Sequence, residues 1–396
     1  MKILFLANRV PYPPFRGDKL KIYNLAKRLC GQHELHLLTF AQTEEDWRYE
    51  PELKKIFTSV QFISLPKWRS MLHCIAGIVD VIPFQVHYFR SAAMKHAVAA
   101  LLLREQFDVV HVQHLRMAQY LEHHTAIPRI LDLPDAFSLY WKRKQETTKN
   151  PVLRFFERLE QKRVYRYERI LERYQLNLVC SGEDKAYLQQ EHGLQHIDLL
   201  PNGVDTSIFF PRAHDYTHNH TLLFTGNMDY GPNIDAVCYF AQDVLPLIRR
   251  QFPSVRFVIA GQRPVPRVRA LANDHISVTG FIPDLSVQYN EASVVVAPLR
   301  FGAGTQNKVL EAMAMGVPVV CSHIGFEGLG IRSGEGAVMQ TSPDGFAQSV
   351  IELLSSECRR REVGEQGIAV IHSRFSWDIV AQQLEAYCAK LAAAGR

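Results

Sequence analysis

The stretch APLRFGAGTQNKVLEAMAMGVPVV, from Ala297 to Val320, decides the fold of this 396-residue chain. A buried strand is predicted to end at Ala297, and a loop with Arg300 and two glycines follows it. A helix is predicted over 306–315, because Gly316 suits the left-handed position just after a helix. A strand, a glycine-containing loop and a helix in this order form the unit from which parallel α/β sheets are built.

The start of that helix is suited to binding phosphate, because free N–H groups and the helix dipole attract anions there. Arg300 and Lys308 add positive charge. Lys308 and Glu311 are three residues apart and project from one face, where Glu311 could accept hydrogen bonds from a ribose. The alternative is an ordinary strand–turn–helix with a surface Lys and Glu. The segment is neither a Walker A loop nor a GxGxxG motif, since Asn307 stands at the third glycine.

The rest of the chain alternates short apolar strands with amphipathic helices, which predicts parallel sheets covered on both faces. In the first half we expect strands at 2–7, 34–39, 60–65, 109–112, 129–133 and 176–180, and helices at 18–29, 92–105 and 151–174. In the second half we expect strands at 220–225, 255–260, 276–279, 294–297, 317–321 and 336–339, and helices at 234–250, 286–292, 306–315 and 343–355.

The predicted fold class is therefore α/β, with two Rossmann-like doubly wound domains that face each other across a cleft. The Asn-Gly turn in LPNGVD, at 200–205, marks the boundary between them. We place the N-terminal domain at 1–205 and the C-terminal domain at 206–375. The segment 376–396 is expected to form a helix that packs back across both domains.

Three predicted strands of the second half end in glycine, at Gly226, Gly261 and Gly280. Ligands of open parallel sheets bind at the carboxyl ends of strands, where glycine lets them approach the backbone. Each glycine alone is better explained by a turn, but three at one sheet edge favour a shared binding cleft. The neighbouring Asn227 and Phe281 are candidates for the same site.

In the first half, Gly17 lies in the loop after the first strand and is expected to let the backbone approach a donor phosphate or an acceptor. Arg16 and Lys19 either contact an anionic acceptor or belong to a solvated loop. His114 follows the strand at 109–112 and is either a cleft residue or a core histidine.

The formal net charge of +5 is concentrated in one segment. Between Lys142 and Arg173, eleven Lys and Arg oppose five Asp and Glu, with Phe155 and Phe156 among them. Such a helix suits an anionic membrane surface or a phosphate-bearing acceptor, and a solvated helix with internal ion pairs is the alternative. No nucleic-acid partner is expected, because no reading motif accompanies the charge.

Seven cysteines without a C-x-x-C pair argue against a disulfide framework and for a reducing compartment. No stretch reaches ~18 apolar residues, so we expect a cytoplasmic protein without a transmembrane helix. The apolar segment 71–83 is interpreted as a core or interdomain helix, with a membrane interface as the alternative. Asp132 and Asp135 are interpreted as helix caps rather than metal ligands, and neither a metal nor a cofactor is expected.

The segment 304–320 resembles the donor signature of the family 4 glycosyltransferases, which have the GT-B fold. The similarity continues through LLFTGNMDYGPNIDA, FVIAGQRP, VTGFIPDL and VVVAPLR upstream and FSW downstream. The N-terminal MKILFLANRVPYPPFRGDKLKIYNLAKRL resembles the opening strand, glycine loop and helix of that fold. The resemblance covers nearly the whole chain and points to sugar transferases of bacterial exopolysaccharide and exosortase gene clusters.

The resemblance implies a retaining transfer of a sugar from a UDP- or GDP-linked donor to a saccharide or lipid-linked acceptor. Preorganised cations and N–H dipoles can stabilise the leaving diphosphate without a metal. His114 resembles the family histidine that faces the transferred sugar. The expected catalytic residues are His114, Arg300 and Lys308. The expected donor-binding residues are Gly17, Gly226, Asn227, Gly261, Gly280, Phe281, Gly304, Thr305, Gln306, Asn307 and Glu311, and Arg16 and Lys19 are the acceptor candidates.

The sequence departs from the family at two places. Ala303 stands where members commonly carry a Glu that bonds the donor sugar, and Asn227 stands where an Arg often follows Gly226. Neutralisation of the diphosphate is therefore expected to depend on Arg300, Lys308 and the helix start. A sugar-nucleotide epimerase of similar fold and a non-catalytic nucleotide-sugar-binding protein are the alternatives.

Overall fold

The computed structural model describes residues 1–15, 17–211 and 220–394. The chain forms two compact units, one made of Met1–Asn202 together with Trp377–Arg396 and the other of Gly203–Ser376. The boundaries expected from the sequence, after residues 205 and 375, lie within three residues of these limits. The N-terminal unit is thus completed by the last segment of the chain.

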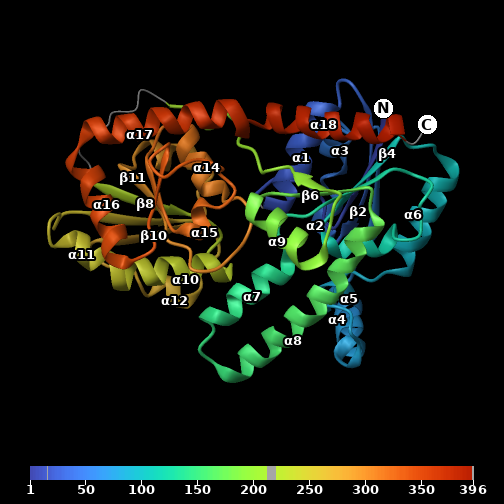
Figure 1. The fold of residues 1–396 in the computed structure, drawn as a ribbon, viewed down its shortest axis with the longest axis horizontal. Coiled ribbons are helices and arrows are strands. Elements are labelled where there is room, and N and C mark those ends of the chain that lie inside the picture. Colours follow the sequence, from blue (N-terminus) through green and yellow to red (C-terminus); the bar gives the residue numbers. More distant parts are fainter. Residues whose placement is uncertain (16, 212–219, 395–396) are drawn as a thin grey trace. The chain divides into compact units, whose positions relative to one another are not determined.

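Seven parallel strands form the sheet of the N-terminal unit, in the order β3-β2-β1-β4-β5-β6-β7 (Figure 1). Successive residues of a strand point to opposite faces. Both faces are buried, since Leu4 and Leu6 belong to one apolar cluster and Phe5 and Ala7 to another. The strands are β1 (Lys2–Ala7), β2 (Glu34–Ala41), β3 (Ser59–Ser64), β4 (Val109–Gln113), β5 (Arg129–Asp132), β6 (Leu176–Val179) and β7 (Ile197–Leu199).

The helical segments of this unit cover both faces of its sheet. They are α1 (Gly17–Leu29), α2 (Glu44–Trp47), α3 (Glu50–Leu53), α4 (Lys67–Ala76), η1 (Gly77–Val79), α5 (Phe84–Tyr88), α6 (Ala92–Arg104), η2 (Leu115–Tyr120), α7 (Phe137–Thr147), α8 (Pro151–Tyr167), η3 (Glu168–Arg173), α9 (Gly182–His192) and α18 (Trp377–Ala394). On the Phe5 face, α18 packs against α1, with Trp377 buried and Arg28 paired to Asp378 at 2.8 Å.

The C-terminal unit has a six-stranded parallel sheet in the order β10-β9-β8-β11-β12-β13. Its strands are β8 (Thr221–Thr225), β9 (Arg256–Ala260), β10 (Ile276–Gly280), β11 (Val294–Ala297), β12 (Val319–Cys321) and β13 (Ala337–Met339). Its helical segments are α10 (Gly231–Tyr239), η4 (Phe240–Val244), α11 (Leu245–Arg249), α12 (Pro266–Arg269), α13 (Leu285–Asn290), α14 (Asn307–Ala314), α15 (His323–Phe326), α16 (Pro343–Ser355), α17 (Glu357–Val370) and η5 (Ile371–Phe375).

In both sheets the strand order reverses between two adjacent strands, at β1 and β4 in one unit and at β8 and β11 in the other. Such reversal points are where doubly wound sheets bind ligands, outside the carboxyl ends of the strands. The prediction of two doubly wound α/β units is confirmed, and a strand occupies every range where one was predicted.

Three helix predictions need correction. The α-helix expected at 151–174 ends at Tyr167. Residues Glu168–Arg173 form the tighter 3-10 helix η3. The helix expected at 234–250 is divided by the π turn η4, because Pro246 has no N–H to donate to the carbonyl of Gln242. The interpretation of 71–83 as a core helix is wrong, since most of its apolar side chains are exposed.

Candidate functional site

Three glycines meet at the carboxyl edge of the C-terminal sheet, beside its reversal point. The Gly226 N–H donates to Ala260 O and the Gly261 N–H donates to Gly280 O, each over 3.0 Å. A Cβ on Gly261 would lie 1.7 Å from Gly226 O, so any larger residue would displace the backbone. The predicted grouping of the three strand ends is confirmed.

Two further candidates lie at the same edge. Asn227 follows Gly226, and its Oδ1 accepts a hydrogen bond from Gln262 Nε2 over 2.7 Å. Phe281 follows Gly280, which has a φ of 78°, and its ring is more than half exposed. An exposed aromatic ring at this edge offers a flat surface on which a base can stack.

The loop from 298 to 306 connects β11 to α14. Gly302 and Gly304 have φ values of 139° and 73°, which favour glycine. Ala303 and Thr305 are buried. Gln306 directly precedes the helix, and its side chain donates to Ala303 O over 3.3 Å instead of capping the helix. The predicted left-handed residue after the helix is confirmed by the φ of 72° at Gly316.

Lys308 lies in the first turn of α14, which begins at Asn307. Its side chain is buried, with Nζ 5.2 Å from the centroid of the Phe224 ring and 3.3 Å from Gln306 Oε1. Burial lowers the pKa of the amine to about 8, and the charge of Glu311 opposes this effect. The alternative of a surface lysine is therefore wrong. A buried cation with a neutral hydrogen-bond partner is suited to receiving an anion.

Glu311, one turn further along α14, is held by the buried Tyr289. The Tyr289 hydroxyl donates to Glu311 Oε2 over 2.7 Å and lies 2.7 Å from Thr225 Oγ1. Burial raises the pKa of the Glu311 carboxyl, while the hydrogen bond from Tyr289 and the charge of Lys308 lower it. Sequence reasoning missed Tyr289 and Thr225. The sequence feature that could have identified Thr225 was its position immediately before Gly226.

Arg300 forms an ion pair with the carboxylate of Asp235. Its Nε and Nη2 lie 2.8 and 2.5 Å from the two oxygens of Asp235 on α10, and its guanidinium lies 4.9 Å from the centroid of the Tyr239 ring. Sequence reasoning named Arg300 but missed Asp235. A ligand diphosphate must therefore compete with Asp235 for this cation.

The start of α1 and the end of β4 contact each other where the strand order of the N-terminal sheet reverses. Gly17 is the first residue of α1, and Gln113 ends β4 next to His114. Gln113 Nε2 donates to Asp18 O over 2.5 Å, so the candidates Gly17 and His114 lie in adjoining segments. Lys19 Nζ lies 3.5 Å from Tyr12 O at the same end of α1.

The acceptor candidate Arg16 lies outside the described residues.

His114 has a φ of 81°, which is uncommon for a residue other than glycine and is frequent at functional sites. Its ring is buried, lies 4.5 Å from the Phe137 ring and contacts the guanidinium of Arg116. Burial, followed by the charges of Arg116 and Arg9, holds the pKa of His114 well below its usual value. The imidazole is therefore neutral at pH 7.

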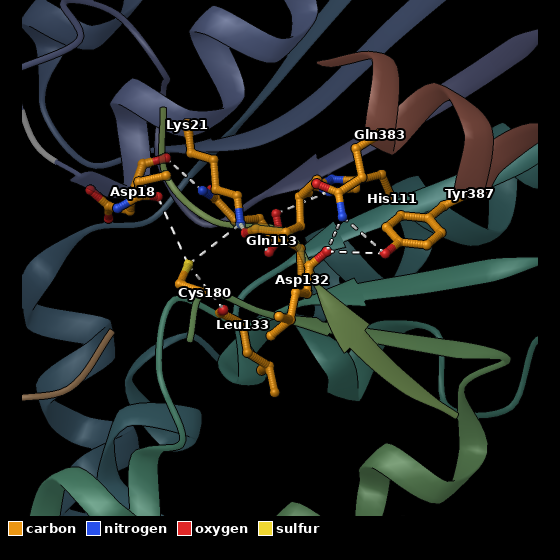
Figure 2. Close-up of polar contacts among 12 residues, drawn as sticks. Asp18, Lys21, His111, Gln113, Asp132, Leu133, Cys180, Gln383 and Tyr387 are labelled. Atoms are coloured by element: carbon orange, nitrogen blue, oxygen red, sulfur yellow. Dashed lines mark hydrogen bonds and ion pairs between the residues drawn. The ribbon is translucent and has the colours of Figure 1, made fainter. Parts of the chain in front are cut away.

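Lys21 and Asp132 form a buried ion pair near the ends of the neighbouring strands (Figure 2). Lys21 Nζ lies 2.6 Å from Asp132 Oδ1 and 2.7 Å from Leu200 O, and His111 Nε2 lies 3.2 Å from Asp132 Oδ2. The interpretation of Asp132 as a helix cap is wrong, because its carboxylate pairs with side chains of α1 and β4.

Within residues 1–15, 17–211 and 220–394, no three His, Cys, Asp or Glu side chains are arranged to hold a metal ion. The same residues contain no helix that is both long and apolar enough to cross a membrane. All seven cysteines are free thiols.

Models of two protein families match the chain. A model described as glycosyltransferase family 4 matches residues 22–208, and one described as glycosyl transferases group 1 matches residues 219–356. A protein described as an uncharacterised 44.6 kDa protein in the cps region of Klebsiella pneumoniae is 21% identical over 94% of this chain and 96% of its own length. Other curated relatives match over about half of their own length.

Solved structures share the fold. The sucrose-phosphate synthase of Thermosynechococcus elongatus superposes with a TM-score of 0.73 at 16% identity and covers 100% of both chains. HepE of Anabaena, in complex with UDP and glucose, has a TM-score of 0.68 at 15% identity and covers 98% of this chain and 100% of its own.

Proposed function

Because this chain belongs to the family 4 glycosyltransferases, which have the GT-B fold, we propose that it transfers a hexose from a nucleoside diphosphate sugar to a saccharide or lipid-linked acceptor. The C-terminal unit binds the donor, UDP- or GDP-linked, at the carboxyl edge of its sheet. The UDP and glucose bound by the similar HepE structure support a donor of this class. No further cofactor takes part in this scheme.

The observation that carries this proposal is the burial of Lys308 at the start of α14. It is the only lysine between residues 203 and 376, and among the described residues its hydrogen-bond partner is the neutral Gln306. Burying an ammonium group without a directly bonded opposite charge costs free energy, of which the nearby Glu311 offsets only a part. A diphosphate seated at the helix start would supply that charge and would also accept from the N–H groups of the first turn.

The remaining donor contacts follow from this position. The backbone at Gly226, Gly261 and Gly280 admits the nucleotide, while Asn227 and Phe281 contact it from the same edge. Glu311 accepts from the ribose hydroxyls. The loop residues Gly304, Thr305, Gln306 and Asn307 surround the diphosphate.

The chemical step breaks the bond between the sugar's anomeric carbon and a diphosphate oxygen. Negative charge builds on the leaving diphosphate as the acceptor hydroxyl oxygen forms the new bond, and the proton of that hydroxyl passes to a diphosphate oxygen. Lys308 and the N–H groups of α14 stabilise that charge in a buried environment, with Arg300 once it leaves Asp235, so this scheme needs no metal. The configuration of the sugar is retained, as the family resemblance implies.

The N-terminal unit binds the acceptor in this scheme. Gly17 lets the acceptor approach the backbone, and Arg16 and Lys19 attract an anionic group. His114, neutral at pH 7, offers one hydrogen-bond donor or acceptor without adding charge.

We place the enzyme in the cytoplasm, with peripheral contact to an anionic inner membrane through the basic segment 142–173. The Klebsiella relative from a cps region supports a role in exopolysaccharide or cell-surface glycan synthesis.

The test is a panel of nucleotide sugars, including UDP-glucose and GDP-mannose, scored first by thermal stabilisation. A ligand that binds only the folded state raises the apparent melting temperature. Lys308→Met should abolish the stabilisation, whereas Arg269→Met, which removes an exposed cation of the same unit, should preserve it. Sugar transfer by Lys308→Met at the wild-type rate would refute the donor site.

A further inference from the structure

An apolar helical segment of the N-terminal unit lies open at the surface. In α4 and η1, six large apolar side chains are each more than half exposed, namely Trp68, Met71, Leu72, Ile75, Ile78 and Val79. Val79 is 95% exposed. Large apolar patches on a folded protein mark sites of interaction with proteins or membranes.

A second exposed segment is the first half of α8. Val152, Leu153, Phe155 and Phe156 are also more than half exposed. Four exposed cations follow one another at four-residue intervals on the same helix, Arg154, Arg158, Lys162 and Arg166. Residues four apart share one helix face, so these cations form a basic stripe.

Three of the four acidic residues of α8 and η3 do not neutralise this stripe, and the fourth, the exposed Glu172, lies beyond the stripe in η3. Glu157 lies 3.2 Å from Lys144 Nζ, Glu160 accepts from the Phe84 N–H over 2.9 Å, and Glu168 accepts from the Ser138 N–H over 2.9 Å. All three are buried and engaged inside the fold. The surface of α8 is therefore more positive than the residue count of the segment indicates.

The two segments belong to one surface. Arg163 of α8 donates from Nη2 to Ile78 O over 2.6 Å, and Glu160 is bonded to Phe84 just beyond η1. Figure 1 shows α4 and α8 close together in this unit. We call the exposed residues of α4, η1 and α8 the apolar–basic surface.

We propose that the apolar–basic surface docks onto an anionic lipid bilayer, with the side chains of α4 and η1 entering the headgroup region and the stripe of α8 facing lipid phosphates. This extends the proposed membrane contact of 142–173 to a segment outside it. Apolar insertion and cationic attraction together are what holds an interfacial helix on anionic lipid. A second copy of the chain fits less well, because it would bring a like-charged stripe to the interface.

The test is co-sedimentation of the full chain with vesicles of phosphatidylcholine alone or with about one third phosphatidylglycerol. We expect the wild-type partition coefficient to be at least about tenfold higher on the anionic vesicles and to fall as salt screens the charges. Ile75→Ser with Val79→Ser should lower it by about tenfold or more, because two apolar side chains no longer leave water.

Matched controls separate this surface from the rest of the unit. Leu103→Ser removes a side chain that is 90% exposed on α6 and should leave binding unchanged. The triple change of Arg154, Arg158 and Lys162 to Gln should abolish the preference for anionic vesicles. Changing the exposed Lys27, Lys95 and Arg104 to Gln removes the same charge elsewhere and should preserve it.

Three outcomes would overturn the proposal. They are equal binding to both vesicle types, equal binding by wild type and the Ile75/Val79 variant, and self-association in solution that the same variant abolishes. Thermal stabilisation by nucleotide sugars, measured without vesicles, tests the donor site separately. A protein that binds nucleotide but not vesicles therefore refutes the docking surface and the membrane contact of 142–173, but not the donor site.

Discussion

The Tyr289 hydroxyl donates to Glu311 Oε2 over 2.7 Å, and it is the group that fixes the orientation of this carboxylate. Thr225 Oγ1, 2.7 Å from the same hydroxyl, completes a chain from the end of β8 through α13 to α14. Since Tyr289 has one hydroxyl proton, its donation to Glu311 requires Thr225 to donate to Tyr289. The carboxylate proposed to bind the ribose is thus positioned by two residues that do not contact the donor in this scheme.

Replacing Tyr289 with Phe should weaken donor binding more than it slows the chemical step. We expect the donor KM to rise about tenfold to 150-fold, because losing a hydrogen bond to a charged group costs about 1.5–3 kcal/mol. The pKa of Glu311 should also rise, so the loss should be larger at lower pH. Steady-state kinetics between pH 5 and 8 measure both effects. An unchanged KM, or an equal effect from Tyr230→Phe at a more exposed site of the same unit, would contradict this role.

Binding of a nucleoside diphosphate should weaken as the pH rises above about 8. The lowered pKa of Lys308 means that the free protein loses this charge near pH 8, while the bound diphosphate favours the protonated amine. The Kd should therefore rise up to about tenfold per pH unit above 8. Calorimetry between pH 7 and 9.5 measures the slope, and Lys308→Met should remove it. A slope that persists in this variant would assign the titration to another group.

The titration of Lys308 should also make the free energy of unfolding depend on pH. The folded-state pKa of Lys308 lies below the ordinary value of 10.5, so the unfolded chain binds more protons between these two values. The contribution of Lys308 to the free energy of unfolding should accordingly increase as the pH rises from about 8 toward 10.5. Urea denaturation of wild type and Lys308→Met over this range tests the difference.

Releasing Arg300 from its carboxylate should favour the ligand. Asp235→Asn removes the charge that competes with a diphosphate for Arg300. We expect the nucleotide Kd to fall by up to about fivefold, the range of a partly exposed ion pair. Arg300→Ala should raise it instead. If both variants weaken binding equally, the pair stabilises the structure of the loop and Arg300 does not contact the diphosphate.

Gly261→Ala should disrupt the sheet edge. The new Cβ would lie 1.7 Å from Gly226 O, and the backbone of two strand ends would have to separate. We expect the free energy of unfolding to fall by about 3 kcal/mol or more. Gly231→Ala is the matched control, because its Cβ would lie 3.7 Å from Phe301 and it begins a helix, where Ala is favourable. Urea denaturation of both variants compares them directly.

The sequence predicted the parts of the site that local pattern determines. Gly226, Gly261 and Gly280 each follow an apolar strand, and parallel strands end at one edge, so their meeting followed from the fold. Gly316 was placed correctly because a helix end has a local backbone requirement. The membrane contact, the acceptor residues and the roles in catalysis remain predictions.

The sequence did not predict the partners that arrive from distant segments. Asp235 is 65 residues from Arg300 and Tyr289 is 22 residues from Glu311, and no motif connects them. The segment 71–83 was misjudged for another reason. An apolar composition predicts that a helix face is buried. The packing of the other helices decides whether any of them covers that face.

The return of α18 to the first sheet has a consequence for synthesis on the ribosome. Trp377, Val380 and Leu384 belong to the same buried cluster as residues of β1 and α1, so the early part of the chain emerges without the helix that closes this face. The C-terminal unit is continuous from Gly203 to Ser376, so all of it is synthesised before α18. The nascent N-terminal sheet therefore keeps an apolar face open until α18 has been synthesised, and chaperones have access to that face until then.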